Sequence, residues 1–175
     1  MISLTIHLDI AYPKWKSAFK KLEEKIERAA GAAFVDAKKP AVFGRRNFEM
    51  SIVLADDKMV KTLNRDYRGI DKPTNVLSFP QFDVAKLKED SFARHPSPNP
   101  IPLGDVVLAW QTLERECRAQ NKTLENHAVH LVVHGTLHLM GYDHIRDKDA
   151  KTMEKLECDI LESLGYPDPY HDSQP

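Results

Sequence analysis

Apolar and polar residues alternate along the first ten residues of the chain. The apolar ones recur at every second position: Ile2, Leu4, Ile6, Leu8 and Ile10. This period of two places them on one face of a half-buried strand. Apolar runs bounded by turn-forming residues predict three more strands, at residues 47–55, 74–80 and 103–109.

Elsewhere the apolar residues recur at the spacing of an α-helix. A first helix is expected over residues 13–30, with Pro13 in its first turn and Gly31 as its stop. A second helix begins at a cap provided by Asp56 or Asp57 and ends at Gly69. Three later helices are predicted over residues 110–120, from a Thr123 cap through residue 140, and over 147–164.

Strands concentrated early and helices late predict an α+β fold, with a mixed sheet of about four strands covered by about five helices. Residues 1–165 are expected to form a single domain, followed by a flexible C-terminal tail at residues 166–175. The stretch "HPSPNPIP" (residues 95–102) is too rich in proline for a helix or a central strand, and predicts a mobile loop or lid.

Composition places the chain among ordinary globular proteins. Its length of 175 residues is enough for one domain. With 42% hydrophobic and 29% charged residues, its composition is not that of a membrane-spanning protein. The N-terminus lacks the basic region of a signal peptide, and Cys117 and Cys158 form no disulfide framework, so a cytoplasmic location is expected. A net charge of −1 gives no global basic field, although a local basic patch remains compatible with it.

The segment "HGTLHLMGYDH" (residues 134–144) has the spacing of a metal site. His134 and His138 lie four residues apart, on one face of the predicted helix. Gly141 lets the chain turn back, so that His144 returns as a third ligand. Three neutral imidazoles suit zinc, and less selectively nickel or copper, and they leave one coordination position open.

Two other histidines complicate the choice of ligands. His127 and His130 project into the same helical sector, so that His130 with His134 is a competing pair. We prefer His134 with His138 because Gly141 and His144 follow that pair at a workable distance. His130 is then expected beside a ligand or in the core, and His127 at the surface. The carboxylate of Asp143 either orients an imidazole or closes the turn.

The spacing of these histidines is that of the metzincin peptidases, H-E-x-x-H-x-x-G-x-x-H, with one difference. Their glutamate activates water on the metal, but the corresponding residue here is Gly135. Peptide hydrolysis therefore becomes a minor hypothesis. Reaction at a phosphate remains available, and it needs a cationic group to bind the phosphate.

Arg65, Arg68 and Lys72 cluster between the second predicted helix and the third strand. An arginine guanidinium matches the oxygens of a phosphate and stays charged at any working pH. The alternative is a solvated helix end whose cations complement the helix dipole. Composition alone favours that alternative.

Three segments together resemble the YbeY family of bacterial endoribonucleases: "LNRDYRGIDKPTNVLSFP" from residue 63, "LGDVVLA" from residue 103 and "HLVVHGTLHLMGYDH" from residue 130. The resemblance covers residues 47–164. It implies zinc held by His134, His138 and His144, with Arg68 as a catalytic residue at the RNA phosphate. It also implies a role in small-subunit ribosomal RNA processing, with 3'-end maturation, and in ribosome quality control.

One departure from this family is Asn75, where aspartate is usual. Ser78 and Asp105, in the two matching strands, are further candidates for binding substrate or a ligand imidazole. Single-stranded RNA is the expected substrate, because its unstacked bases can be read while its backbone follows a groove. Ribosomal or ribosome-assembly proteins are expected as partners that provide specificity.

Three rival functions stay open. The chain could be a metallohydrolase of a peptide or ester, which would not depend on Arg68. It could be a structural zinc protein, although three histidines without cysteine favour a catalytic site. It could also be a zinc-containing ribosome-assembly factor that acts by binding alone. The oligomeric state is left open.

Overall fold

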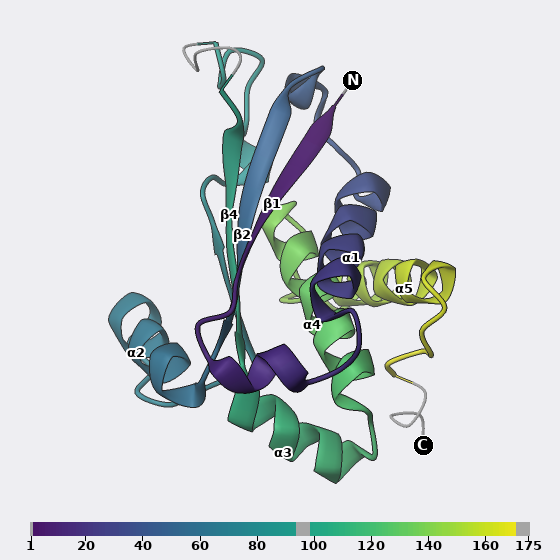
Figure 1. Cartoon of the computed structure of the whole chain (residues 1–175). Coiled ribbons are helices and arrows are strands. Elements are labelled where there is room, and N and C mark those ends of the chain that lie inside the picture. Colours follow the sequence, from purple (N-terminus) through teal and green to yellow (C-terminus); the bar gives the residue numbers. More distant parts are fainter. Residues whose placement is uncertain (1, 94–98, 171–175) are drawn as a thin grey trace.

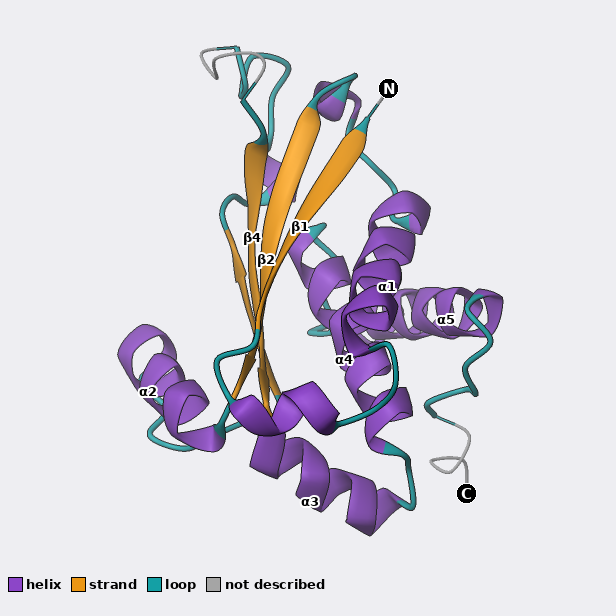
Figure 2. Cartoon of the chain, viewed as in Figure 1, coloured by secondary structure: helices purple, strands orange, loops and turns teal. Residues whose placement is uncertain are grey.

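Four strands form one mixed sheet in the computed structural model, which describes residues 2–93 and 99–170 (Figure 2). The strands are β1 (Ser3–Asp9), β2 (Asn47–Ala55), β3 (Val76–Pro80) and β4 (Ile101–Ala109). Their order across the sheet is β1-β2-β4-β3. The pairs β1–β2 and β2–β4 are parallel, and β3 is antiparallel to β4 at one edge.

Helices pack against both faces of this sheet (Figure 1). The α-helices are α1 (Leu22–Asp36), α2 (Asp57–Arg68), α3 (Trp110–Gln120), α4 (Leu124–Leu139) and α5 (Asp147–Ser163). Helix α2 lies on one face, whereas α1 and α4 lie on the other, with α5 packed outside them. The predicted α+β class, with a four-stranded mixed sheet and five helices, is confirmed.

The core has two parts, one on each side of the sheet. The larger part lies under α1 and α4, where Ile26, Phe48 and Val132 are fully buried. A smaller cluster under α2 includes Val60 and Leu77. Because burial of apolar side chains is the main driving force of folding, both faces of the sheet contribute to holding α2 and α4 in place.

The expected first helix over residues 13–30 is wrong in both of its boundaries. Pro13–Ser17 forms only a short 3-10 helix, and α1 begins at Leu22 after Lys21, which has a left-handed backbone with φ 56°. Gly31 does not stop the helix, which continues to Asp36. The buried face of α1 continues beyond Gly31 through Phe34, so packing against the core outweighs the low helix propensity of glycine.

Two predicted helix caps are confirmed. The side chain of Asp56 accepts a hydrogen bond from the backbone N–H of Met59, and that of Thr123 accepts one from Asn126. Gly69 ends α2 with φ 72°. These caps fix the start of α4 and the end of α2, which are the two helices that bear the candidate site.

The predicted loop lies only partly within the described residues, because residues 94–98 fall outside them. Before this gap Phe92 is buried against Phe43 and Phe48. In the expected tail, residues 166–170 contact the domain, and the hydroxyl of Tyr166 donates to Glu125. Residues 171–175 lie outside the described part. Within the described ranges, no helix is long and apolar enough to cross a membrane.

Candidate metal site and cleft

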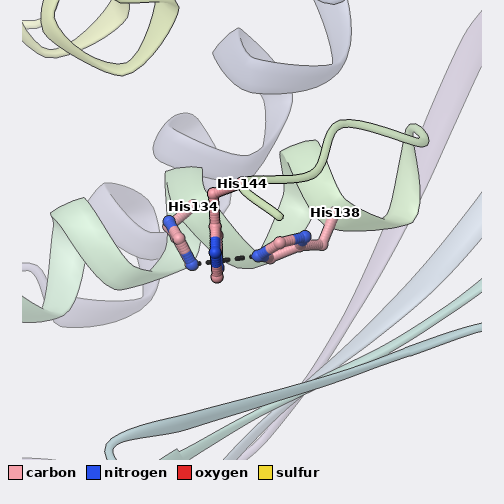
Figure 3. Close-up of side chains that lie close together, drawn as sticks. All are labelled: His134, His138 and His144. Carbon is pink, nitrogen blue, oxygen red and sulfur yellow. Dashed lines mark hydrogen bonds between the residues drawn. The ribbon is translucent and has the colours of Figure 1, made fainter. Parts of the chain in front are cut away.

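Helix α4 and the turn after it bring three imidazoles together (Figure 3). His134 and His138 lie one turn apart near the C-terminal end of α4. Gly141 follows with φ 89°, a left-handed conformation that glycine adopts without strain. His144 then points back toward the other two rings, so the structure brings together all three predicted ligands, with their donor atoms within 4.8 Å of one another.

The hydrogen bonds of His134 and His138 determine which ring nitrogen faces the other. Nδ1 of His138 lies 2.9 Å from the carbonyl oxygen of Tyr142, which can only accept, so Nδ1 carries the proton. Nδ1 of His134 likewise lies 2.8 Å from a carboxylate oxygen of Glu157. The Nε2 atoms of the two rings therefore face each other, and they lie 3.0 Å apart.

Two ring nitrogens at this distance can share a proton in a hydrogen bond or bind one metal ion together. Tetrahedral zinc with bonds of about 2.0–2.1 Å places two ligand nitrogens about 3.3 Å apart. The 3.0 Å separation is close to that value. The three imidazoles therefore fit a metal ion.

The buried carboxylate of Glu157 was not predicted from the sequence. It lies on α5, and its second oxygen is 2.7 Å from Nε2 of His130. His130 thus lies beside the candidate ligand His134, as expected, and Glu157 contacts both rings. Helical spacing could have revealed this glutamate, because it lies on the buried stripe of α5 with Met153 and Ile160. Asp143, by contrast, accepts from the backbone N–H of His144 and so closes the turn.

Burial and hydrogen bonding set the protonation of these groups. Burial raises the pKa of Glu157, but hydrogen bonds from His130 and His134 outweigh this effect and lower it to about 2. Burial, assisted by the neighbouring His134, lowers the pKa of His138 to about 4. At neutral pH the glutamate is therefore an anion, and His138 is in the neutral form that binds metal.

The expectation that His127 lies at the surface is wrong. Its side chain is 6% exposed, and its Nε2 lies 2.7 Å from Glu116 on α3. The amide of Asn75 also donates to both carboxylate oxygens of Glu116. Asn75, the departure noted in the sequence, therefore makes the local hydrogen bonds that a second carboxylate could not make.

A cleft of about 620 Å³ opens in front of the three imidazoles. Its other side is formed by β3, with Ser78, and by the end of α2, with Arg68. The guanidinium of Arg68 donates to the carbonyl oxygen of Ser78 at 3.4 Å. The cleft therefore places a cation opposite the candidate metal ligands.

The other predicted candidates do not line this cleft. Arg65 forms an ion pair with Asp66 at 2.8 Å, and neither Arg65 nor Lys72 is among the residues that line the cleft. Asp105 is exposed on the opposite face of the sheet, since its neighbour Val106 faces α4. Among the described residues, no carboxylate forms an ion pair with Arg68, so its guanidinium is available to an anionic ligand.

Gly135 allows α4 to lie directly on the sheet. A Cβ atom at this position would be 2.7 Å from Cγ1 of Val106 on β4 and 3.1 Å from Oγ of Ser78 on β3. Such distances are shorter than ordinary van der Waals contacts. The position at which metzincins carry their glutamate therefore faces the sheet too closely to hold a side chain.

Comparison with known proteins decides the family. The family model described as Endoribonuclease YbeY matches residues 12–165, which is most of the chain. The chain belongs to the YbeY endoribonuclease family. The histidine segment, Arg68 and both walls of the cleft all lie within the matched region, and the resemblance noted in the sequence is confirmed.

Individual members of the family match over nearly the whole chain. Endoribonuclease YbeY of Paramagnetospirillum magneticum is 46% identical over 171 residues, covering 97% of both chains. That of Sinorhizobium medicae is 40% identical over 177 residues, covering 100% of this chain and 99% of the relative. The solution structure of TM1509 from Thermotoga maritima matches with a TM-score of 0.52 at 23% identity, covering 94% of this chain and 98% of that one, and this shows a shared fold.

Proposed function

We propose that this chain is a metal-dependent endoribonuclease that cuts single-stranded RNA. Its role is in 3'-end maturation of small-subunit ribosomal RNA and in ribosome quality control. Zinc is held by His134, His138 and His144, and Arg68 is the catalytic residue. The observation that carries the proposal is the group of three imidazoles, with donor atoms within 4.8 Å of one another, in a cleft that also contains Arg68. Membership of the YbeY family supplies the class of substrate.

The ligand set favours zinc. Three neutral imidazoles with an open fourth position are typical of catalytic zinc sites, and nickel or copper are possible substitutes. When bound, the ion supplies positive charge that polarises a phosphate oxygen or ionises a water near neutral pH. The contribution of the chain is to hold the Nδ1 atoms of His134 and His138 against hydrogen-bond acceptors, so that Nε2 is the nitrogen left to bind the ion.

Arg68 stabilises the charge that develops on the phosphate oxygens during cleavage. Its guanidinium offers several donors in one plane, and a fixed cation aimed at developing charge lowers the barrier of phosphoryl transfer. The carbonyl of Ser78 orients this guanidinium at the cleft wall. Arg68 can therefore hold the scissile phosphate against the metal side of the cleft.

The nucleophile does not depend on a glutamate from α4. Gly135 has no side chain and no space for one. The attacking group is either water or the neighbouring 2'-hydroxyl of the RNA. Attack by the 2'-hydroxyl leaves a cyclic phosphate, and hydrolysis leaves a terminal phosphate, so the ends of the products identify which one attacks.

The charge of the whole molecule indicates how RNA is chosen. A net charge of −1 predicts modest affinity for RNA by itself. Ribosomal or ribosome-assembly proteins therefore provide specificity, in the cytoplasm where ribosomes are assembled.

Cleavage of a labelled ribosomal RNA 3'-end precursor tests the proposal. The wild type, Arg68→Ala, His138→Ala and Arg65→Ala are compared, and metal content is determined on the same samples. Arg65 is the matched control, since it lies on the same helix but is paired with Asp66 outside the cleft. We expect Arg68→Ala to keep its metal and lose cleavage by about 10³-fold or more, as for a transition-state arginine. His138→Ala should lose both its metal and RNA cleavage, and Arg65→Ala should retain both.

Two results would contradict the proposal in different ways. Equal cleavage by all four proteins means that the activity comes from a contaminant, and the chain is then a metal-containing assembly factor. Cleavage of a peptide or ester that needs metal but not Arg68 means a hydrolase of another substrate.

A further inference from the structure

A carboxylate is buried behind the three imidazoles, on the side away from the cleft. The side chain of Glu157 is only 1% exposed. Burying an unpaired carboxylate is very costly, so such a group persists only where donors surround it. Its two oxygens lie 2.8 Å from Nδ1 of His134 and 2.7 Å from Nε2 of His130.

The C-terminal segment supplies a third donor to this carboxylate. The hydroxyl of Tyr170 donates to the same oxygen of Glu157 that contacts His130. The Tyr170 ring also packs edge-on against the His130 ring, with centroids 5.5 Å apart. Lys122 holds the segment from outside, because its ammonium donates to the carbonyl oxygen of Pro169 at 2.7 Å.

We propose that Glu157 is the positioning residue for the metal ligand His134, and that Tyr170 tunes metal affinity by securing Glu157. The inference rests on the ligand assignment of the proposed function. Accepting the Nδ1 proton of His134 fixes one tautomer of this imidazole, with the lone pair of Nε2 on the cleft side. The same contact prevents the ring from rotating, so that His134 is held in the orientation needed for binding a metal ion.

His130, His134 and Glu157 also form a second group whose donor atoms all lie within 4.8 Å of one another. Their hydrogen-bonding capacity is already used within the group and by Tyr170. An ion there would also have to share the His134 ring with the first one. The geometry therefore favours His130 and Glu157 as supports of the single metal site at His134, His138 and His144. Binding of two ions per chain would contradict this assignment.

Metal affinity of the full-length chain, measured by competition with a chromogenic zinc chelator, tests the proposal. The variants are Glu157→Gln, which keeps the shape but removes the charge, and Tyr170→Phe, which removes one hydroxyl. We expect zinc to bind about 10–100-fold more weakly to Glu157→Gln, the range typical of residues that hold a metal ligand. The loss in Tyr170→Phe should be smaller, about threefold to tenfold, because two donors to the carboxylate remain.

Tyr166→Phe is the matched control. Tyr166 belongs to the same C-terminal segment and also donates to a carboxylate, that of Glu125, which is not part of the metal network. Zinc affinity should be unchanged in this variant. Stability of the metal-free proteins is measured in parallel, because a merely structural role would lower stability without a separate change in affinity.

Each outcome has a distinct meaning. Wild-type affinity in a folded Glu157→Gln overturns the role of Glu157. Equal losses in Tyr170→Phe and Tyr166→Phe overturn the role of Tyr170, and this comparison remains decisive if Glu157→Gln does not fold. Failure of the wild type itself to bind zinc contradicts the proposed function instead, so the two failures are distinguishable.

Discussion

Gly135 has a packing role at the point where α4 crosses the sheet. Its hydrogen faces Val106 and Ser78, and no larger group fits there without movement of a strand. The close approach brings His134 and His138 to the edge of the sheet, opposite Arg68. In this chain, the residue that replaces the peptidase glutamate is thus a requirement for assembling the cleft.

Replacing Gly135 with alanine should therefore destabilise the protein. We expect a loss of about 1–3 kcal/mol in the free energy of unfolding, the usual cost of overpacking, measured by urea denaturation. Gly31→Ala is the control, since Gly31 is also helical but a methyl group there would meet no neighbouring element within 4 Å. That variant should gain about 0.5–1 kcal/mol. Similar changes in both variants would contradict the packing role.

The hydrogen bonds of Glu116 predict a pH-dependent contribution to stability. Burial raises the pKa of this carboxyl, but hydrogen bonds from His127 and Asn75 outweigh burial and lower it. A lowered folded-state pKa stabilises the fold above the ordinary pKa of 4.5, and this gain is lost as pH falls through the folded value. Glu116→Gln should thus cost about 1 kcal/mol at pH 7, and the difference from wild type should shrink below about pH 4.5.

Urea denaturation at a series of pH values measures this difference. The control is Glu114→Gln, because among the described residues Glu114 forms an ion pair only with the exposed Arg118 on the surface of α3. Its effect should stay below about 0.5 kcal/mol at every pH. A cost for Glu116→Gln that does not change with pH would show that the charge of Glu116 is not involved.

At the scale of the element, the turn after α4 determines whether His144 reaches the other two candidate ligands. Gly141 has φ 89°, and a Cβ atom there would lie 2.8 Å from Cβ of Val84. Gly165, after α5, has a similar φ of 84° but open space around it. Comparing alanine variants of the two glycines therefore separates the cost of backbone strain from the effect of the turn on the metal site.

Alanine at either glycine should cost about 1–2 kcal/mol of stability, because a left-handed backbone is strained for any residue with a Cβ. Only Gly141→Ala should also weaken zinc binding, since it displaces His144 from His134 and His138. The chelator competition assay measures this loss. Equal zinc affinity in both variants would mean that the turn does not position His144.

Local patterns predicted the elements whose limits are encoded in a few adjacent residues. The caps at Asp56 and Thr123, and the proximity of the candidate ligands on α4, follow from spacings within a turn or two. The break at Lys21 had no such signal, because a left-handed backbone at a lysine follows from no local sequence pattern. Contacts between elements could not be predicted from local patterns either. Glu157 on α5 contacts His134 on α4. The register of β3 and β4 places Asp105 on the face of the sheet away from the histidines.

At the scale of the whole molecule, the cleft joins the two faces of the sheet. Arg68 comes from α2 on one face, and the three histidines come from α4 and its turn on the other. The edge strand β3 lies between them, and the carbonyl of Ser78 on this strand accepts from Arg68. The candidate site therefore exists only when the complete domain has folded.

RNA binding by this cleft should weaken as salt increases. Each phosphate neutralised on a single strand adds about 0.7 to the magnitude of the slope of log affinity against log salt concentration. Arg68→Ala should reduce that magnitude by about 0.7, and Arg65→Ala should leave it unchanged. Fluorescence anisotropy with labelled single-stranded RNA measures both slopes. Affinity that does not depend on salt would contradict binding of phosphate by Arg68.

The most direct test of the account is to restore zinc to the metal-free chain while measuring RNA cleavage. If His134, His138 and His144 hold a single catalytic ion, cleavage is absent without zinc, rises in proportion to added metal, and levels off at one ion per chain. Full cleavage by the metal-free chain, or a break point at two ions, would contradict the account.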